Sequence, residues 1–65
     1  MVRLVKLINA EKNRPVYVNA ENIIWAEALS GNETSIRFVG NQTLVVLGTP
    51  EDLVVAIGKT ERGQL

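Results

Sequence analysis

Short apolar runs alternate with clusters of Asn and Gly along the chain, and this pattern limits the possible folds more than any other feature of the sequence. Apolar runs of this length, bounded by turn-forming residues, are typical of antiparallel strands. The expected strands cover residues 3–8, 15–19, 23–29, 34–39 and 42–47. Pro15 has no backbone N–H and therefore suits a strand start or a sheet edge. Gly40 and Asn41 predict a two-residue hairpin, because Gly accepts the positive φ that a type II′ turn requires.

The periodicity changes after the last of these runs, where a short helix is expected to begin. Thr49 is the predicted N-cap, Pro50 occupies the first helical position, and two acidic residues follow at the positive end of the helix dipole. Asp52 stands where a capping box usually has Glu or Gln, so the predicted box is imperfect. One helix face carries Leu53, Val54 and Ile57. Gly58 is the expected residue just after the helix, and residues 59–65 are expected to form a polar, flexible tail.

Residues 44–47 are apolar at four consecutive positions, so both faces of this strand should be covered. A short helix can cover only one face of a five-stranded sheet. The other face must be covered by the sheet curling into a barrel or by a second copy of the chain. We therefore expect an α+β fold in which about five short antiparallel strands form a curved sheet, barrel-like or open, with one C-terminal helix. Residues 1–58 are the expected single domain.

The chain has 65 residues and contains neither Cys nor His. These absences exclude disulfide miniproteins, zinc fingers, thiol enzymes and any enzyme whose proton shuttle is an imidazole. A domain of this size buries only about 60% of the surface that its unfolded chain exposes. Association is the common stabilising device that remains when disulfides and metals are missing. We therefore expect a homo-oligomer or an obligate protein partner.

Seven basic and seven acidic residues give a formal net charge of zero, but the charges are unevenly distributed. Residues 1–20 contain four basic residues and one acidic residue, whereas residues 21–65 contain three basic and six acidic residues. The basic third could face an anionic partner or the acidic part of a neighbouring subunit. Ordinary scatter of surface charge explains the imbalance equally well.

No constellation of residues indicates catalysis or a cofactor. The Ser, Thr and Tyr hydroxyls have no His to activate them, and the adjacent acids Glu51 and Asp52 are explained by the helix start. Neither an EF-hand pattern nor a Gly-rich phosphate loop is present. We therefore expect a protein that is not an enzyme and needs no cofactor or metal. No apolar run reaches the roughly 18 residues of a membrane span, and the N-terminal charges lie within the apolar pattern, so we expect a cytoplasmic protein without membrane insertion.

Five residues are candidates for an interaction surface: Tyr17, Trp25, Arg37, Val45 and Leu47. Trp25 and Glu27 face outward if the alternate residues of their strand face inward, namely Ile24, Ala26 and Ala28. An exposed Trp on a sheet is a frequent interface anchor, but a chain with few aromatic residues could equally use Trp25 in its core. A three-residue hairpin loop at 31–33 would place Glu27 opposite Arg37 as a cross-strand pair.

Nucleic-acid binding is the alternative function. A sheet that carries several basic residues beside Tyr17 and Trp25 could hold phosphates and stack bases. The basic residues in question are Arg3, Lys6, Arg14 and Arg37. A sequence pI of about 6.2 argues against this alternative, because nucleic-acid-binding domains normally have a clear basic excess.

The order of the sequence motifs resembles that of a known family. A strand rich in Leu and basic residues covers residues 2–7, followed by V-Y-V-N-A-E at 16–21 and I-I-W-A-E-A at 23–28. A T-S-I-R-F strand at 34–38, a Gly-Asn turn and an apolar strand leading into the helix complete the series. In this order the chain is similar to the small flagellar and swarming-motility proteins of the FlbD type. The resemblance implies an accessory role in flagellar motility, and we predict a non-enzymatic, self-associating interaction protein.

Two features depart from that family. The loop at residues 9–14 is longer and more charged than the family's tight Gly-containing turn, and Leu47 and Gly48 stand where a basic residue often precedes the helix. The same order of strands and helix also resembles the DNA-binding LytTR type, so a nucleic-acid-binding regulatory module stays the alternative.

Overall fold

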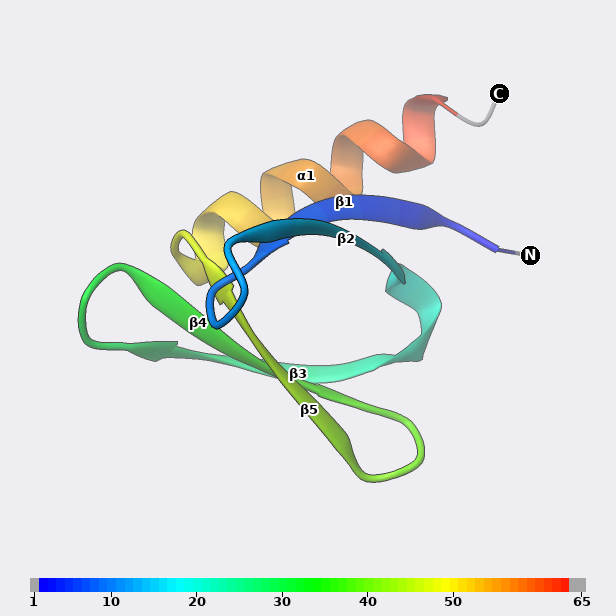
Figure 1. Cartoon of the computed structure of the whole chain (residues 1–65). Helices are drawn as coiled ribbons and strands as arrows, with labels where there is room; N and C mark the ends of the chain where they lie inside the picture. Colours follow the sequence, from blue (N-terminus) through cyan, green and yellow to red (C-terminus); the bar gives the residue numbers. More distant parts are fainter. Residues whose placement is uncertain (1, 64–65) are drawn as a thin grey trace.

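The computed structural model describes the backbone of residues 2–63 and the side chains of residues 2–59. It contains five antiparallel strands, one turn of 3-10 helix and one α-helix (Figure 1). These elements are β1 (Leu4–Asn9), β2 (Arg14–Asn19), η1 (Ala20–Asn22), β3 (Ile23–Leu29), β4 (Glu33–Phe38), β5 (Gln42–Leu47) and α1 (Pro50–Gly63). The predicted α+β class, a five-stranded antiparallel sheet with one C-terminal helix, is confirmed.

The strands form one sheet in the order β2-β1-β5-β4-β3, so the two edge strands are consecutive in the chain and are joined by η1. A connection this short between opposite edges requires the sheet to curl. In Figure 1, β1 and β2 arch over one side of an interior that β3, β4 and β5 bound on the other side. No strand pairing joins β2 to β3 within residues 2–63, so the curled sheet stays open.

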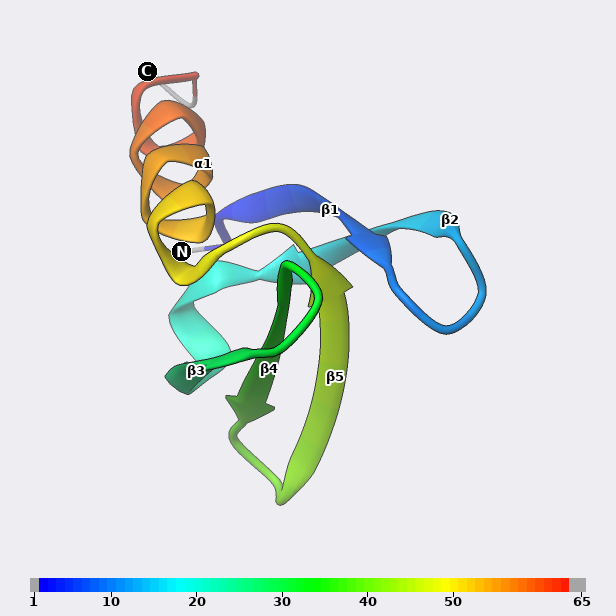
Figure 2. The ribbon, with the colours of Figure 1, turned by 90° about the vertical axis from the view of Figure 1, so that its left-hand side faces the viewer.

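Backbone pairing is uneven around the sheet. The β1–β2 and β4–β5 hairpins are each paired along six residues. In contrast, β1 and β5 pair only at Asn9 and Val46, where the N–H of Ala10 also donates to the carbonyl of Val45 at 2.9 Å. Beyond this joint the two hairpins diverge (Figure 2).

The core lies inside the curled sheet and beneath α1. Its buried apolar side chains come from β1, η1, β4, β5 and α1: Val5, Leu7, Ala20, Ile36, Val46 and Leu53. Full burial of one aliphatic side chain stabilises a fold by about 1.5–3 kcal/mol. Because α1 packs against both β1 and β3, it bridges the two parts of the sheet. The joint between β1 and β5 therefore depends more on side-chain packing than on backbone hydrogen bonds.

The start of α1 is more completely capped than the sequence predicts. Thr49 Oγ1 accepts a hydrogen bond from the N–H of Asp52 at 3.1 Å, and Asp52 Oδ2 accepts one from the N–H of Thr49 at 3.0 Å. Asp52 thus completes a reciprocal capping box, and the prediction of an imperfect box is wrong. Gly48 precedes the box with a φ of 104°, and a Cβ at this position would lie 3.1 Å from Asp52 Oδ2.

The predicted helix end is also wrong, because α1 continues through Gly58 to Gly63. Gly58 has a helical backbone instead of the positive φ of a glycine that follows a helix. The next residues include Lys59, Glu61 and Arg62, whose unbranched side-chain types lose little rotamer freedom in a helix. Residues 64 and 65 of the expected tail lie outside the described residues.

Both loops of the β3-β4-β5 meander contain three residues. Phe38 pairs with Gln42, so the second loop covers residues 39–41, and the expected two-residue hairpin is wrong. Gly40 and Asn41 both have positive φ, at 91° and 70°, whereas a type II′ turn requires it only at the first position. In the first loop, Leu29 pairs with Glu33, so the loop covers residues 30–32.

Thr34 is fully buried at the start of β4, and its polar atom is satisfied. The Thr34 hydroxyl donates to the carbonyl of Gly48 at 2.8 Å, and the N–H of Gly48 donates to the carbonyl of Asn32 at 2.7 Å. A buried hydroxyl without a hydrogen-bond partner is costly, so the Thr34 hydroxyl favours conformations that keep Gly48 next to it. The two bonds therefore fix the position of the β5–α1 connection against the start of β4.

Candidate interaction surface on the sheet

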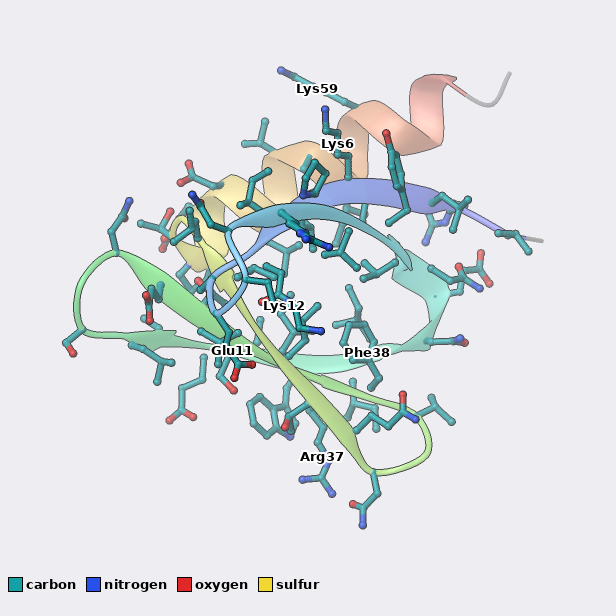
Figure 3. All side chains as sticks on the ribbon, viewed as in Figure 1. Lys6, Glu11, Lys12, Arg37, Phe38 and Lys59 are labelled. Carbon is teal, nitrogen blue, oxygen red and sulfur yellow. The ribbon has the colours of Figure 1, made fainter. Side chains whose placement is uncertain are left out.

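The register of β3, β4 and β5 gathers nine side chains on one side of the sheet, which we call the outer face. Its three rows run across the strands as Trp25–Arg37–Thr43, Glu27–Ser35–Val45 and Leu29–Glu33–Leu47. Because side chains alternate along a strand, the intervening residues face the interior, where Thr34, Ile36 and Val46 are buried. Figure 3 shows this alternation at two neighbours, since Phe38 points into the interior and Arg37 points away from it.

Three large apolar side chains stay exposed on the outer face. Trp25, Leu29 and Leu47 have relative exposures of 43%, 41% and 44%, and Val45 is half-buried. The curl of the sheet encloses the opposite side, and Leu53 anchors α1 in that enclosed core. The single chain therefore leaves Val45 and Leu47 of β5 on an uncovered side, although the sequence predicts cover for both faces of this strand.

The outer face also carries charges of both signs. Arg37 lies at one end of β4 and Glu33 at the other, with Ser35 between them, and Glu27 lies on β3. The Arg37 guanidinium donates to the side-chain oxygen of Asn41. Exposed apolar groups among a few charges of mixed sign suit contact with another protein. A face that binds phosphates would show an excess of positive charge.

Four of the five predicted candidates lie together on the outer face: Trp25, Arg37, Val45 and Leu47. Tyr17 does not join them, because it is exposed on β2 opposite Lys6. The sequence interpretation missed Leu29 and Glu33. Leu29 could have been found, since it is four residues from Trp25 in the same strand and so shares its side. Glu33 could be assigned to the outer face only if the length of the loop between β3 and β4 were known.

A β-bulge between Ile23 and Trp25 decides which way this part of β3 faces. Ile24 is exposed at the bulge and does not face inward as a regular alternation with Trp25 would require, because the extra residue of a bulge leaves the strand alternation. Trp25, and not Glu27, lies opposite Arg37, since the loop before β4 covers residues 30–32 instead of 31–33. Trp25 therefore lies on the outer face and outside the buried core.

The basic residues considered for nucleic-acid binding are dispersed. Arg3 forms an ion pair with Glu21, with 3.2 Å between Nε and Oε2. Lys6 and Arg14 lie on the β1–β2 hairpin, whereas Arg37 lies on β4. The structure thus brings Arg37 beside Trp25 but does not bring the other three basic residues to that face.

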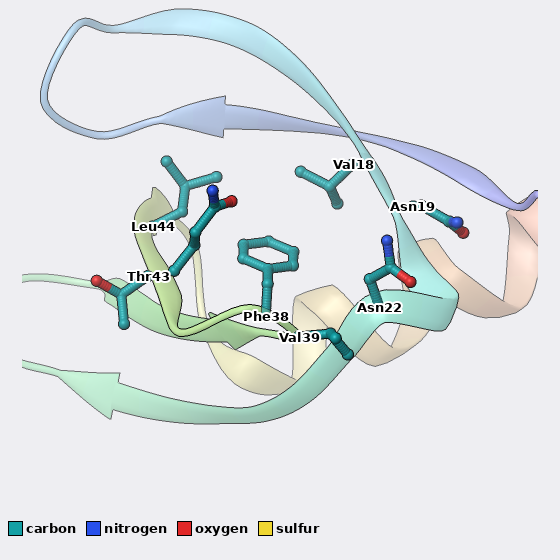
Figure 4. Close-up of a pocket in the computed structure, with 8 residues that line it drawn as sticks. Val18, Asn19, Asn22, Phe38, Val39, Thr43 and Leu44 are labelled. Carbon is teal, nitrogen blue, oxygen red and sulfur yellow. The ribbon is translucent and has the colours of Figure 1, made fainter.

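A second candidate feature is the seam, which we define as two adjoining hollows where β5 parts from the β1–β2 hairpin. One hollow, of about 330 Å³, has Val18, Phe38 and Leu44 as apolar lining and Asn19, Asn22 and Gln42 as polar lining (Figure 4). The other, of about 340 Å³, includes Asn9, Glu11 and Val45. Thr43 and Leu44 line both hollows, so the seam follows the first half of β5.

Within the described residues, no three side chains of the metal-binding types come together as ligands. The part of the chain that the structure describes has no helix long and apolar enough to cross a membrane. Comparisons with family models, with curated proteins and with solved structures found no match to this chain.

Proposed function

We propose that this chain is a non-enzymatic interaction module that associates with a second copy of itself through the outer face. The observation that carries the proposal is the exposure of Trp25, Leu29 and Leu47 on the same sheet face as the half-buried Val45. Several large apolar side chains exposed on one face of a small protein are typical of a protein interface, and Trp is a frequent anchor in such interfaces.

The charges of the outer face fit a second copy in one orientation. Two copies can stack their outer faces about a two-fold axis that runs between the sheets, parallel to their planes and perpendicular to the strands. When this axis lies over the central row, it reverses the row order and keeps each strand opposite its counterpart. Arg37 then lies opposite the partner subunit's Glu33, and Trp25 lies opposite the partner's Leu29. A two-fold axis parallel to the strands would instead place Arg37 opposite the partner's Arg37. Glu27 meets its own copy only at the edge strand, where solvent screens the repulsion.

The size of the outer face suits a dimer of moderate affinity. A standard interface takes about 800 Å² from each partner, which is roughly a sixth of the 4575 Å² accessible surface of this chain. The three strands have six or seven residues each and together span about 14 Å by 20 Å. The outer face therefore supplies the centre of an interface at the small end of the range, and we expect dissociation at micromolar concentration.

Light scattering after size exclusion, over a series of protein concentrations, tests this proposal. The wild-type chain is expected to dimerise, and Trp25→Ala is expected to weaken the dimer at least about tenfold, because truncating a Trp anchor in an interface commonly costs about 2 kcal/mol or more. Tyr17→Ala is the matched control, since Tyr17 is an exposed aromatic residue outside the outer face. A wild-type chain that stays monomeric at high micromolar concentration would overturn the proposal.

The resemblance to the small flagellar and swarming-motility proteins supports a motility-linked setting for this module. Retention on heparin separates the nucleic-acid alternative, because phosphate binding weakens steeply as salt rises. A monomer with strongly salt-dependent retention would favour a nucleic-acid-binding regulator. A dimer that heparin does not retain at low salt supports the interaction module.

A further inference from the structure

Two hydrogen bonds define how the backbone of β5 is oriented. The N–H of Gly48, directly after β5, donates to the carbonyl of Asn32 on the β4 side, and the carbonyl of Val45 accepts from Ala10 on the β1 side. Alternate residues of a strand direct their backbone groups to opposite edges. The even-numbered residues of β5 therefore face β4, and the odd-numbered residues face β1.

At Thr43, an odd-numbered residue, the edge of β5 that faces β1 has no paired strand. The pairing of β1 with β5 is confined to Asn9 and Val46, so within residues 2–63 no strand lies opposite Thr43. The backbone N–H and C=O of Thr43 consequently face the seam. An unpaired strand edge is a template on which another extended chain can pair.

The hollow beside Thr43 indicates the chemistry of such a chain. Val18, Phe38 and Leu44 offer an apolar surface, and Figure 4 shows the Phe38 ring in the middle of the hollow. The side-chain amides of Asn22 and Gln42 add both donors and acceptors, whereas Asn19 Oδ1 already accepts from the backbone N–H groups of Arg3 and Glu21. None of the residues that line this hollow is charged. A charged side chain would lose its hydration here without a charged partner.

We propose that the seam binds an extended, uncharged segment of a partner protein by strand addition. The backbone of the segment pairs with Thr43, and one apolar side chain of the segment enters the hollow against Phe38. Backbone pairing supplies affinity, and the neutral hollow supplies selection against charged segments. The side chain of Thr43 belongs to the outer face, whereas its backbone N–H and C=O face the seam. A segment can therefore bind in the seam of a monomer as well as of a dimer.

The probe is the blocked peptide acetyl-TVLVT-amide, titrated into the full-length ¹⁵N-labelled chain at a concentration where light scattering shows a monomer. We expect amide shift changes concentrated at Phe38, Thr43 and Leu44. A peptide with Lys in the central position, and one N-methylated at the central amide, are each expected to bind about tenfold more weakly, the first through desolvation and the second through loss of a backbone hydrogen bond.

Two protein variants test the same contacts from the other side. Thr43→Pro removes the N–H that faces the seam without removing a β4–β5 hydrogen bond, and Phe38→Leu reduces the apolar surface while keeping a large side chain. Both are expected to weaken peptide binding, and Phe38→Leu keeps the test valid if Thr43→Pro does not fold. No shift change at millimolar peptide, or equal binding of the N-methylated peptide, would refute strand addition. Concentration-dependent shifts at Val18 and Asn22 without peptide would assign the seam to a second copy and also overturn the proposal, because these residues line the hollow and lie outside the outer face.

Discussion

The two edges of β5 are held in different ways. On one edge β5 is paired with β4 along six residues, and on the other it is paired with β1 at a single position. The β3-β4-β5 meander therefore builds a regular outer face from backbone pairing alone. The β1–β2 hairpin is attached through buried side chains and through α1, which touches both β1 and β3. Backbone pairing shapes the candidate interface. Side-chain packing holds together the two halves of the sheet, namely the β1–β2 hairpin and the β3-β4-β5 meander.

The largest effect is expected from the side chain that connects α1 to both halves. Leu53 is buried in the core, so Leu53→Ala should lower the free energy of unfolding by about 2–5 kcal/mol. Val54→Ala is the control, because Val54 is 68% exposed and its loss should change stability by no more than about 0.5 kcal/mol. Urea unfolding at a fixed protein concentration measures both. A loss below about 1 kcal/mol for Leu53→Ala would show that α1 does not hold the halves together.

Substituting Ala for Gly48, just before α1, and for Gly58, within α1, should change the free energy of unfolding in opposite directions. Gly48→Ala forces a side chain into a positive φ beside Asp52 and should destabilise the fold by about 1–3 kcal/mol. Gly58→Ala should stabilise it by about 0.5–1 kcal/mol, because Gly58 is helical and a Cβ there meets no neighbour. Thermal unfolding compares the two variants with wild type. Destabilisation by Gly58→Ala would instead mean that the helix ends at this glycine.

A smaller effect is expected at the capping box. Asp52→Ala removes the acceptor for the N–H of Thr49 and should cost about 0.5–2 kcal/mol. Asp52→Glu, which restores the usual capping-box residue, should recover most of this loss. The same unfolding measurement checks both variants. Equal losses for Ala and Glu would indicate that the short carboxylate is specifically required beside Gly48.

The two edges of β5 can also be compared without any substitution. The amide of Leu44 faces β4 and should exchange slowly with solvent, whereas the amide of Thr43 faces the seam and should exchange fast. Hydrogen exchange followed by NMR gives both rates in one experiment. Similar protection of the two amides would show that the seam is closed in solution.

The strands and the helix start could be predicted from the sequence because their signals are local. The bounds of β3 and β5 agree with the apolar runs, and those of β1, β2 and β4 differ by one residue. Asn and Gly mark the loops, and Asn13, Asn32 and Asn41 do adopt positive φ. The chain also places most predicted surface candidates on one face, because strand alternation is a local property.

The remaining details depend on contacts between elements. Each loop of the meander differs by one residue from its prediction, and a shift of one residue changes which side chains lie opposite each other. Arg37 therefore faces Trp25 instead of Glu27. The bulge at Ile24 and the single pairing of Asn9 with Val46 follow from how the sheet curls, which no local pattern encodes. The seam could therefore not be predicted from the sequence, because it forms where the curled sheet separates β1 from β5.

A charge-exchange experiment by light scattering tests the two-fold outer-face interface most directly. Arg37→Glu alone and Glu33→Arg alone should each impair dimerisation, because each places like charges opposite one another. An equimolar mixture of the two variants should dimerise again, since opposite charges then face each other at both positions. Lys12→Glu and Glu11→Lys, which make the same net charge changes in the loop between β1 and β2, should each dimerise like wild type. Single variants that dimerise normally, or a mixture that stays monomeric, would contradict the outer face as the site of self-association.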